Sequence, residues 1–245
     1  MNDLAIVIPA RYSSLRFPGK LLQNLKGKPV IQWVHERAAS TGIDQIFIAT
    51  DSDEIEACAK KFKANVVRTQ STHINGTERI AEVAHHLQWP DDMQIINLQG
   101  DEPLINPAII IQLAEMISNK SPDMATIVSN FSDINDYRNL STAKVILDHH
   151  GFAVNFTRAF LPNVKLADIQ SIVYRHHGIY GYKVSTLKKI IATKPSKLEN
   201  FERLEQLRAL WLGIKILTLP TTIESPRGID TAQDLEYLET YLASE

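Results

Sequence analysis

The segment Leu4-Ala5-Ile6-Val7-Ile8-Pro9 places five apolar residues in succession and ends them with a proline. A short continuous apolar run is typical of a strand that is buried on both faces, as strands of parallel sheets are. Gln45–Thr50 and Met93–Leu98 repeat the pattern, and the segments between these runs carry apolar residues at helical spacing. Strands that alternate with helices in this way predict an α/β fold with a mainly parallel sheet and right-handed crossovers.

Two of the predicted helices begin at recognisable caps. Asp51, with Glu54 three positions later, is expected to cap the helix that follows the second strand. Asn106 followed by Pro107 has the order of an N-cap and a first helical position, and this helix is expected to end near Ile117.

The second half of the chain is richer in strand patterns. Lys144–Asp148 and Phe152–Phe156 flank His149-His150-Gly151, which predicts a hairpin. We expect these strands to belong to an antiparallel insertion, roughly residues 125–185, that extends the sheet within one domain covering residues 1–245. Toward the C-terminus the pattern predicts two helices and the strand between them: Leu198–Leu212, Lys215–Leu219, and a last helix from Thr231.

Composition excludes several classes of protein. The 245 residues include 26 Lys+Arg and 28 Asp+Glu, so the formal net charge is −2, and 44% of the residues are apolar. These values are ordinary for a globular protein and far from the signature of disorder. The near-neutral balance argues against bulk electrostatic attraction to nucleic acid or to a membrane surface.

The single cysteine, Cys58, shares a predicted helix face with Ile55 and Ala59, so we interpret it as a core residue rather than a reactive thiol. One cysteine makes neither an intrachain disulfide nor a multi-thiolate metal site, which suits a reducing compartment. No segment approaches the roughly 18 apolar residues of a membrane span, and the N-terminus lacks the features of a signal peptide. We therefore expect a cytoplasmic protein.

Polar residues gather at three predicted strand ends, where ligands bind in α/β sheets. The first is the loop after Pro9. It carries three cations and three small residues: Arg11, Arg16, Lys20, Ser13, Ser14 and Gly19. Cations together with backbone N–H donors suit a polyphosphate. The spacing is not that of a P-loop, and a solvated basic loop is the alternative interpretation.

The other two strand ends carry acids. Asp101 and Glu102 follow an apolar strand, and Asp230 precedes the last helix. Thr231 with Asp234 makes a reasonable helix cap, so Asp230 is not needed for capping and is a candidate second metal ligand beside Asp101. Mg²⁺ takes few carboxylates together with waters and phosphate oxygens, which fits such a pair. A turn with a helix-capping acid is the alternative for Asp101.

Histidine-containing segments are further candidates for ligand or metal binding. His73–Arg79 opens a predicted helix, whose N–H groups suit a base or phosphate, although a plain cap explains it as well. His176 and His177 are adjacent on a predicted strand, so their side chains are expected on opposite faces, which disfavours a His-ligated Zn²⁺ site. The pairs His85-His86 and His149-His150 are expected at the surface or in turns.

Seven short motifs stand in order along the chain. They are Ala10-Arg11-x-x-Ser14-x-Arg16-x-Pro18-Gly19-Lys20, Ala49-Thr50-Asp51, Gly76-Thr77-Glu78-Arg79, Gln99-Gly100-Asp101-Glu102-Pro103, His176-x-Gly178-Ile179-Tyr180-Gly181-Tyr182, Leu204-Glu205-Gln206-Leu207-Arg208 and Gly228-Ile229-Asp230-Thr231. Over essentially the whole chain, this set resembles the 3-deoxy-manno-octulosonate cytidylyltransferase (CMP-Kdo synthetase) family of lipopolysaccharide biosynthesis.

The resemblance implies a Rossmann-like nucleotidyltransferase fold, usually a homodimer, with the insertion at 125–185 as the dimerisation region. It also implies a reaction: CTP and an eight-carbon 2-keto sugar acid give the CMP-sugar and pyrophosphate, with Mg²⁺ as cofactor.

The family pattern also assigns roles to residues. The implied catalytic residues are Lys20, Arg11, Asp101 and Asp230, of which Asp101 and Asp230 bind the metal. The implied nucleotide-binding residues are Ala10, Arg11, Ser14, Lys20, Ala49, Thr50, Asp51, Gly76, Thr77 and Gln99. The implied sugar-binding residues are Arg158, His176, Tyr180, Glu205 and Gln206.

The sequence departs from the family pattern at Leu15, Asn75, Asn163 and Lys197. Those on the sugar side leave room for a modified substrate such as the 8-amino analogue of Kdo. Two further alternatives are a cytidylyltransferase for another sugar acid, such as a nonulosonate, and a non-catalytic nucleotide-binding module. The last is expected to lack Lys20 or one of the two acids, and all three are present.

Overall fold

The computed structural model describes residues 3–13 and 17–244. The strands are β1 (Leu4–Ala10), β2 (Asn24–Leu25), β3 (Lys28–Pro29), β4 (Ile46–Thr50), β5 (Asn65–Arg68), β6 (Gln94–Asn97), β7 (Met124–Ser129), β8 (Lys144–Leu147), β9 (Ala153–Thr157), β10 (Val173–Lys183) and β11 (Ile216–Pro220). The helices are the 3₁₀ turn η1 (Lys20–Leu22), α1 (Val30–Ala39), α2 (Asp53–Lys61), α3 (Gly76–His86), α4 (Pro107–Lys120), α5 (Ile134–Arg138), α6 (Leu166–Ile169), α7 (Val184–Ile191), α8 (Lys197–Glu202), α9 (Gln206–Trp211) and α10 (Ala232–Ser244).

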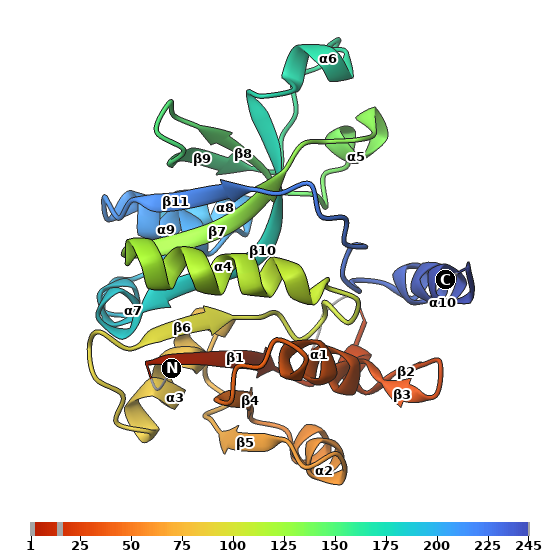
Figure 1. Ribbon diagram of the computed structural model, residues 1–245, viewed down its shortest axis with the longest axis vertical. Helices are drawn as coiled ribbons and strands as arrows, with labels where there is room; N and C mark the ends of the chain where they lie inside the picture. The colour runs from red at the N-terminus through yellow and green to blue at the C-terminus, as the bar shows by residue number, and fades with distance from the viewer. Residues whose placement is uncertain (1–2, 14–16, 245) are drawn as a thin grey trace.

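Nine strands of the described chain form one sheet with the order β11-β7-β10-β6-β1-β4-β5, and β8 and β9 extend it from β10 (Figure 1). β1 pairs in parallel with β4 and β6, β4 with β5, and β7 with β11. β10 runs antiparallel to β6, β7 and β8, and β8 is antiparallel to β9. The prediction of an α/β fold with a mainly parallel central sheet and antiparallel strands in the second half is therefore confirmed.

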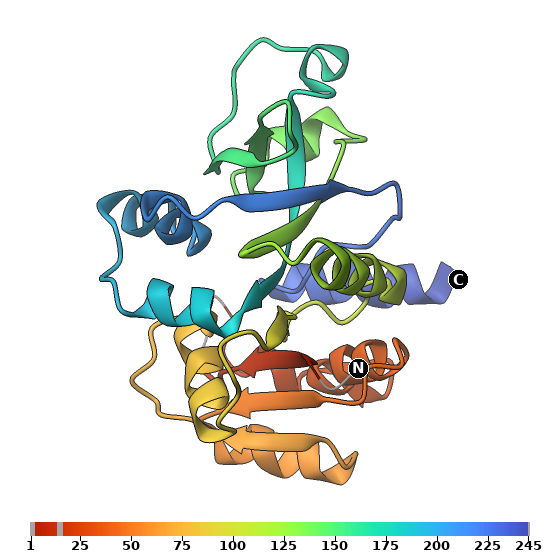
Figure 2. The same cartoon turned by 60° about the vertical axis from the view of Figure 1, so that its left-hand side comes forward.

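Helices cover both faces of the sheet, which gives three layers (Figure 2). Ile6 and Ile8 of β1 point into the core beneath α1, α2, α4 and α10, whereas Ala5 and Val7 point into the core beneath α3, α7 and α9. From Ala5 to Ile8 the exposed fraction of each residue is 0%, as expected of a strand covered on both faces. The apolar run at the start of the chain thus forms the middle of the protein.

β10 connects the parallel part of the sheet to the insertion. Its C-terminal half pairs with β6 and β7, and its N-terminal half pairs with β7 and β8. The register against β7 shifts between His176 and Tyr180, and Gly178 between them has φ of +73°. Glycine adopts this left-handed conformation without steric cost, and such irregularities redirect side chains along a strand.

Several local predictions are confirmed. The Asn106 side chain caps α4 by accepting a hydrogen bond from the Ala108 backbone N–H, and Pro107 is the first helical residue. α4 continues one turn beyond the predicted end, to Lys120. The predicted hairpin is formed by β8 and β9. The Asp234 carboxylate and Thr231 form the predicted cap of α10. Cys58 is half-buried and packs against the core, and burial raises the pKa of its thiol.

Two local predictions are wrong. Ser52, not Asp51, caps α2, since its Oγ accepts the Ile55 N–H. The predicted helix over Leu198–Leu212 is two helices, because Arg203 takes a left-handed conformation with φ of 55° and ends α8.

The break between α8 and α9 has a physical reason. The Arg208 guanidinium donates to the Glu199 carboxylate at 2.6 and 2.8 Å. Residues nine positions apart on a straight helix are separated by roughly 13 Å along its axis, so this pair requires the bend.

Within the described residues, no helix combines the length and apolarity needed to cross a membrane.

Candidate active site

Two adjoining cavities open beside the carboxyl ends of β1 and β6. The first cavity has a volume of about 500 Å³ and is lined by Pro9, Ala10, Arg11, Lys20, Leu21, His73, Asn75, Gly76, Arg79, Gln99, Gly100, Asp101, Leu140, Ser141, Arg158, Arg203, Glu205 and Asp230. The second cavity has a volume of about 510 Å³. Its lining includes Thr77, Asn97, Glu102, Asn139, Thr142, Ala143, Arg175, His176, His177, Tyr180, Tyr182, Gln206, Arg227 and Gly228. Both cavities share Gln99, Asp101, Ser141, Arg158, Arg203, Glu205 and Asp230, so they meet at these residues.

Lys20 lies where the two predicted metal ligands meet. Its Nζ is 2.6 Å from Asp101 Oδ2, 3.2 Å from Asp230 Oδ1 and 2.7 Å from the Ile229 carbonyl oxygen. Burial lowers the pKa of Lys20, but the Asp101 and Asp230 carboxylates outweigh it and raise that pKa above its ordinary value. The fold therefore brings two acids that are distant in sequence to one cation.

Two glycines allow the segments that carry these acids to approach each other. A Cβ atom on Gly100 would lie 2.9 Å from the Pro9 carbonyl oxygen, so the chain after β6 passes closely beside the end of β1. A Cβ atom on Gly228 would lie 2.7 Å from Glu102 Oε1 and 2.8 Å from the Asp101 carbonyl oxygen. That same Asp101 oxygen accepts a hydrogen bond from the Ile229 N–H at 2.8 Å, which fixes the segment before α10 against the site.

Glu102 stands behind the acid pair. Burial raises the pKa of Glu102 to about 8, and the neighbouring Asp101 and Asp230 carboxylates add to that effect, whereas the Arg175 guanidinium opposes it. This environment therefore favours the protonated form of Glu102 over its carboxylate.

The N-terminus of α3 forms one wall of the first cavity. Asn75 caps the helix by accepting the Glu78 N–H at 2.9 Å, and Gly76 packs on the Pro9 ring. Arg79, whose exposed fraction is 3%, lines the same wall and forms an ion pair with Asp51 at 3.3 Å. A helix N-terminus and a fixed guanidinium together favour an anionic ligand in this cavity.

The second cavity is lined by both charged and neutral polar groups, among them the Glu205 carboxyl. Glu205 Oε2 accepts hydrogen bonds from Thr77 Oγ1 at 2.8 Å and from the Thr77 N–H at 3.4 Å. Burial raises the pKa of Glu205, and the Thr77 hydrogen bonds partly offset the rise. Tyr180 Oη and Gln206 Nε2 are buried and have no hydrogen-bond partner among the described residues. Buried polar atoms without a partner are costly, and a hydroxyl-rich ligand would satisfy them.

The two adjacent histidines both belong to the lining of this cavity. His176 Nε2 lies 3.1 Å from Thr126 Oγ1, and His177 Nε2 lies 2.9 Å from Ser129 Oγ. Thr126 lies on the face of β7 that carries Met124 and Val128, whereas Ser129 lies on the face that carries Ala125 and Ile127. The two histidine side chains therefore point to opposite faces of the sheet, as predicted. Burial lowers the pKa of each imidazole to about 3, with nearby positive charge adding to the effect, so both histidines are neutral near pH 7.

Most predicted site residues meet at the two cavities, but three do not line either one. Ala49 and Thr50 are completely buried at the end of β4, and Asp51 is held by Arg79. Asp51 is therefore connected to the first cavity through its ion pair with Arg79, which lines that cavity. Ser14 lies outside the described residues. The pairs His85-His86 and His149-His150 are exposed, as predicted.

Sequence reasoning missed two parts of the lining. Arg203 lines both cavities from the break between α8 and α9, and nothing in the apolar spacing of that segment marked the break. The loop of residues 139–143 also lines both cavities. Its sequence has neither a strand nor a helix pattern, so nothing in it predicted this placement. Arg79 belongs to the candidate segment His73–Arg79, but the sequence does not indicate that its side chain is buried.

Comparisons with known proteins agree with this geometry. A family model described as cytidylyltransferase matches residues 5–216. The chain is 43% identical over 247 residues to a 3-deoxy-manno-octulosonate cytidylyltransferase of Vibrio cholerae serotype O1, with 98% of each chain covered. It is 40% identical to the protein of that name from Pasteurella multocida, with 99% of each chain covered.

Solved structures extend the comparison. A structure of CMP:2-keto-3-deoxy-manno-octonic acid synthetase complexed with CTP superposes with a TM-score of 0.88, at 35% identity and 98% coverage of each chain. A cytidylyltransferase from Leptospira borgpetersenii superposes with a TM-score of 0.67 at 18% identity, which is a likeness of fold.

Proposed function

The chain belongs to the cytidylyltransferase family, and on that premise we propose that it activates 3-deoxy-manno-octulosonate (Kdo) with CTP. The products are the CMP-sugar and pyrophosphate, and the pathway served is lipopolysaccharide synthesis. The observation that carries the proposal is the convergence of Asp101 and Asp230 on Lys20 where the two cavities meet.

We assign CTP to the first cavity. Arg11, Lys20 and Arg79 supply three cations to its lining, and the N-terminus of α3 adds the positive end of the helix dipole beside Gly76. This combination neutralises a polyphosphate while leaving room for a base beside it. Gln99, which donates from Nε2 to Asn97 Oδ1 at 3.1 Å, lies at the boundary where the sugar must approach.

We assign the sugar acid to the second cavity. Arg158 has the planar fork that suits a carboxylate, and Glu205 offers an acceptor for hydroxyl groups. Tyr180 and Gln206 contribute the unpartnered polar atoms described above, and neutral His176 adds a further polar contact. Because the two cavities meet at Asp101 and Asp230, the sugar's anomeric hydroxyl and the α-phosphate of CTP would also meet there.

Mg²⁺ is the cofactor that we propose for Asp101 and Asp230. Two carboxylates that already converge on one cation form a hard oxygen donor set, which fits Mg²⁺. Across residues 3–13 and 17–244, no cluster of three or more His, Cys, Asp and Glu side chains is placed to hold a metal ion. We therefore expect phosphate oxygens of CTP and water to complete the ligand set. When bound, the ion would polarise the α-phosphate and lower the pKa of the attacking hydroxyl.

The chain's own residues have the tasks of positioning and of charge neutralisation. The sugar's 2-hydroxyl gives its proton to solvent as its oxygen attacks the α-phosphorus in line, the bond to the β-phosphate oxygen breaks, and pyrophosphate leaves. Lys20 and Arg11 stabilise the negative charge on the transferring and leaving phosphates. Arg158 and Glu205 hold the sugar so that its hydroxyl faces the phosphorus, and such positioning accounts for a large part of catalysis in phosphoryl transfer.

We also propose a cytoplasmic homodimer. The insertion at 125–185 exposes several large apolar side chains: Leu140, Ile146, Val154, Leu161 and Ile172. A second copy of the chain would cover them, and light scattering coupled to size exclusion tests this by giving the mass of two chains or of one. The single cysteine, whose thiol is half-buried, suits a reducing compartment.

Pyrophosphate release by the purified protein tests the function. With Mg²⁺ and CTP, release is expected on addition of Kdo, and kcat/KM for Kdo is expected to exceed kcat/KM for its 8-amino analogue. A higher value for the analogue would reassign the sugar, and an absence of release with both sugars would overturn the proposed function.

A further inference from the structure

Lys144 is a buried cation that the chemistry above does not use. It opens β8 and its exposed fraction is 1%. Its ammonium donates three hydrogen bonds, all to backbone carbonyl oxygens: Asn139 at 2.6 Å, Thr142 at 2.9 Å and Arg158 at 2.9 Å. An ammonium has three N–H donors, so each one has an acceptor.

The three acceptors belong to two separate walls of the site. Asn139 and Thr142 lie in the loop of residues 139–143, between α5 and β8, and Arg158 follows the last residue of β9. The loop lines both cavities, as Arg158 does. A single ammonium therefore joins the loop to the strand end that carries the proposed carboxylate-binding guanidinium.

Contacts from the loop reach two of the proposed sugar-binding residues. Arg158 Nη1 donates to the Ser141 carbonyl oxygen at 2.5 Å, so the orientation of the guanidinium depends on where the loop lies. The His176 N–H donates to the Ala143 carbonyl oxygen at 3.1 Å, which ties β10 to the same loop. A displaced loop would move both Arg158 and His176.

Burial of a lysine ammonium costs folding free energy, which hydrogen bonds to the charge must offset. Burial lowers the pKa of Lys144 to about 8, the Arg158 guanidinium lowers it further, and the Asp136 and Glu202 carboxylates oppose the shift. An apolar residue at this position would avoid that penalty but would leave three carbonyl oxygens without their donor. The position is thus built to hold the loop.

We propose that Lys144 is a positioning residue for the sugar acid, which fixes the loop of residues 139–143 against the end of β9 so that Arg158 and His176 meet the sugar in one arrangement. The inference rests on the proposed function, because it assumes that the second cavity binds the sugar acid. Lys144 acts through the backbone and does not touch the substrate.

The test compares Lys144→Met and Lys144→Gln with the unmodified chain. Both variants keep most of the side-chain volume, and glutamine retains two of the donors. We expect kcat/KM for the sugar acid to fall by ~10–100-fold in Lys144→Met, the scale of a small misplacement at a reacting centre, and by less in Lys144→Gln. The affinity for CTP, measured without sugar, is expected to change by less than about threefold, because most of the first cavity lies away from the loop.

Val145→Ala is the matched control. Val145 is the next residue of β8, is fully buried and packs in the apolar core. The substitution lowers stability without removing a hydrogen bond to the loop. It is therefore expected not to reduce kcat/KM for the sugar acid selectively. Amide hydrogen exchange gives a readout that needs no substrate: residues 139–143 are expected to exchange faster in the Lys144 variants than in Val145→Ala.

Unchanged kcat/KM for the sugar acid in Lys144→Met would overturn the inference. If that variant does not fold, unchanged kcat/KM in Lys144→Gln would do the same. An equal loss of CTP affinity, or the same selective loss in Val145→Ala, would also overturn it, since either result indicates a general structural effect. Failure of the proposed function is a separate outcome, in which the unmodified chain releases no pyrophosphate while the exchange of the loop still responds to Lys144.

Discussion

Replacing Glu199 with glutamine tests the account of the bend between α8 and α9. Glu199 accepts two hydrogen bonds from Arg208, whose exposed fraction is 2%, and it also completes the cap of α8 with Ser196. Glutamine keeps the shape but removes the charge, so the Arg208 guanidinium stays buried with its nearest remaining carboxylate oxygen, that of Glu78, 3.6 Å away. Removing one partner of a buried ion pair typically costs about 3–5 kcal/mol.

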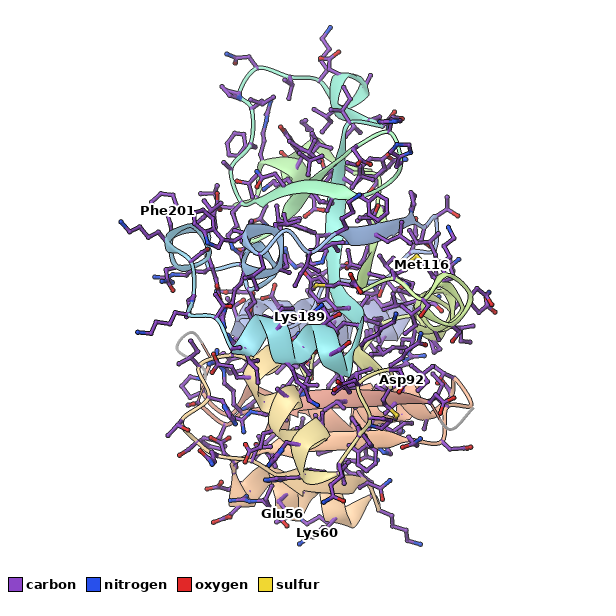
Figure 3. The ribbon with its side chains drawn as sticks, turned by 90° about the vertical axis from the view of Figure 1, so that its left-hand side faces the viewer. Glu56, Lys60, Asp92, Met116, Lys189 and Phe201 are labelled. Atoms are coloured by element: carbon purple, nitrogen blue, oxygen red, sulfur yellow. The ribbon has the colours of Figure 1, made fainter. Side chains whose placement is uncertain are left out.

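Urea unfolding monitored by circular dichroism measures the effect. The free energy of unfolding of Glu199→Gln is expected to fall by about 3–5 kcal/mol, which for a chain of this size lowers Tm by roughly 6–20 °C. Lys60→Met is the control, because Lys60 pairs with Glu56 at the surface of α2, as Figure 3 shows, and the Lys60 side chain is 67% exposed. Exposed pairs contribute little, so the control is expected to match the unmodified chain.

Function supplies a second readout of the same change. α9 follows directly on Glu205, so a loosened junction is expected to raise KM for the sugar acid more than KM for CTP. A loss of stability below about 1 kcal/mol in Glu199→Gln would refute the claim that this pair sets the bend. A loss as large in Lys60→Met would refute the argument that burial decides the size of the effect.

Three further predictions use other residues of the site. Lys20→Met is expected to reduce kcat/KM for CTP by ~10²–10³-fold, because the proposed phosphate site loses one of its cations; near-normal kinetics would remove Lys20 from the reaction. Gly228→Ala is expected to displace the segment that carries Asp230, because its Cβ would lie 2.7 Å from Glu102 Oε1. The free energy of unfolding is expected to fall by about 1–3 kcal/mol, together with a loss of activity. A fully active and stable variant would show that the close approach is not required. The pKa of about 3 for His177 lies below the unfolded value, so its neutral form stabilises the fold above about pH 6.5 and this contribution is lost as pH falls toward 3. Between pH 6.5 and 5, the free energy of unfolding of His177→Gln, measured with urea, is therefore expected to fall by up to about 2 kcal/mol less than that of the unmodified chain. The same pH dependence in both proteins would contradict the burial of that imidazole.

Continuous apolar strands and residues at caps were the most predictable parts of the fold. The run from Leu4 to Ile8 has one physical solution, a strand with both faces covered, and Asn106 followed by Pro107 leaves little choice for the start of α4. The prediction of Asp51 as the cap of α2 was wrong. The neighbouring Ser52 caps the helix, and the Asp51 carboxylate instead forms an ion pair with the buried Arg79. Local sequence could not distinguish the two.

Long-range contacts decided the rest. Asp101 and Asp230 were candidate ligands of one metal, but the sequence alone could not show that they come together. The structure brings both carboxylates to Lys20, although the roles of these residues stay predictions. The break at Arg203 depends on an ion pair formed across it, which no window of the sequence reveals. The loop of residues 139–143 lines the site and is hydrogen-bonded to Lys144 through backbone carbonyl oxygens, and backbone acceptors cannot be recognised in side-chain patterns.

The surface beyond the site was not predictable from patterning either. Phe201 projects from α8 at the edge of the protein, with an exposed fraction of 85%, although its apolar character would suggest a core position (Figure 3). It lies on the segment that sequence spacing assigned to one long helix. The extent of the domain and the dimer interface stay predictions.

Binding of Mn²⁺ as a probe for Mg²⁺, measured by electron paramagnetic resonance in the presence of CTP, tests the shared acid site most directly. If Asp101 and Asp230 hold one ion, Asp101→Asn and Asp230→Asn each weaken protein-bound Mn²⁺ severely, and the double variant is little worse than either single one. If either single variant binds Mn²⁺ and CTP as the unmodified chain does, the two carboxylates do not share a metal and the central claim is contradicted.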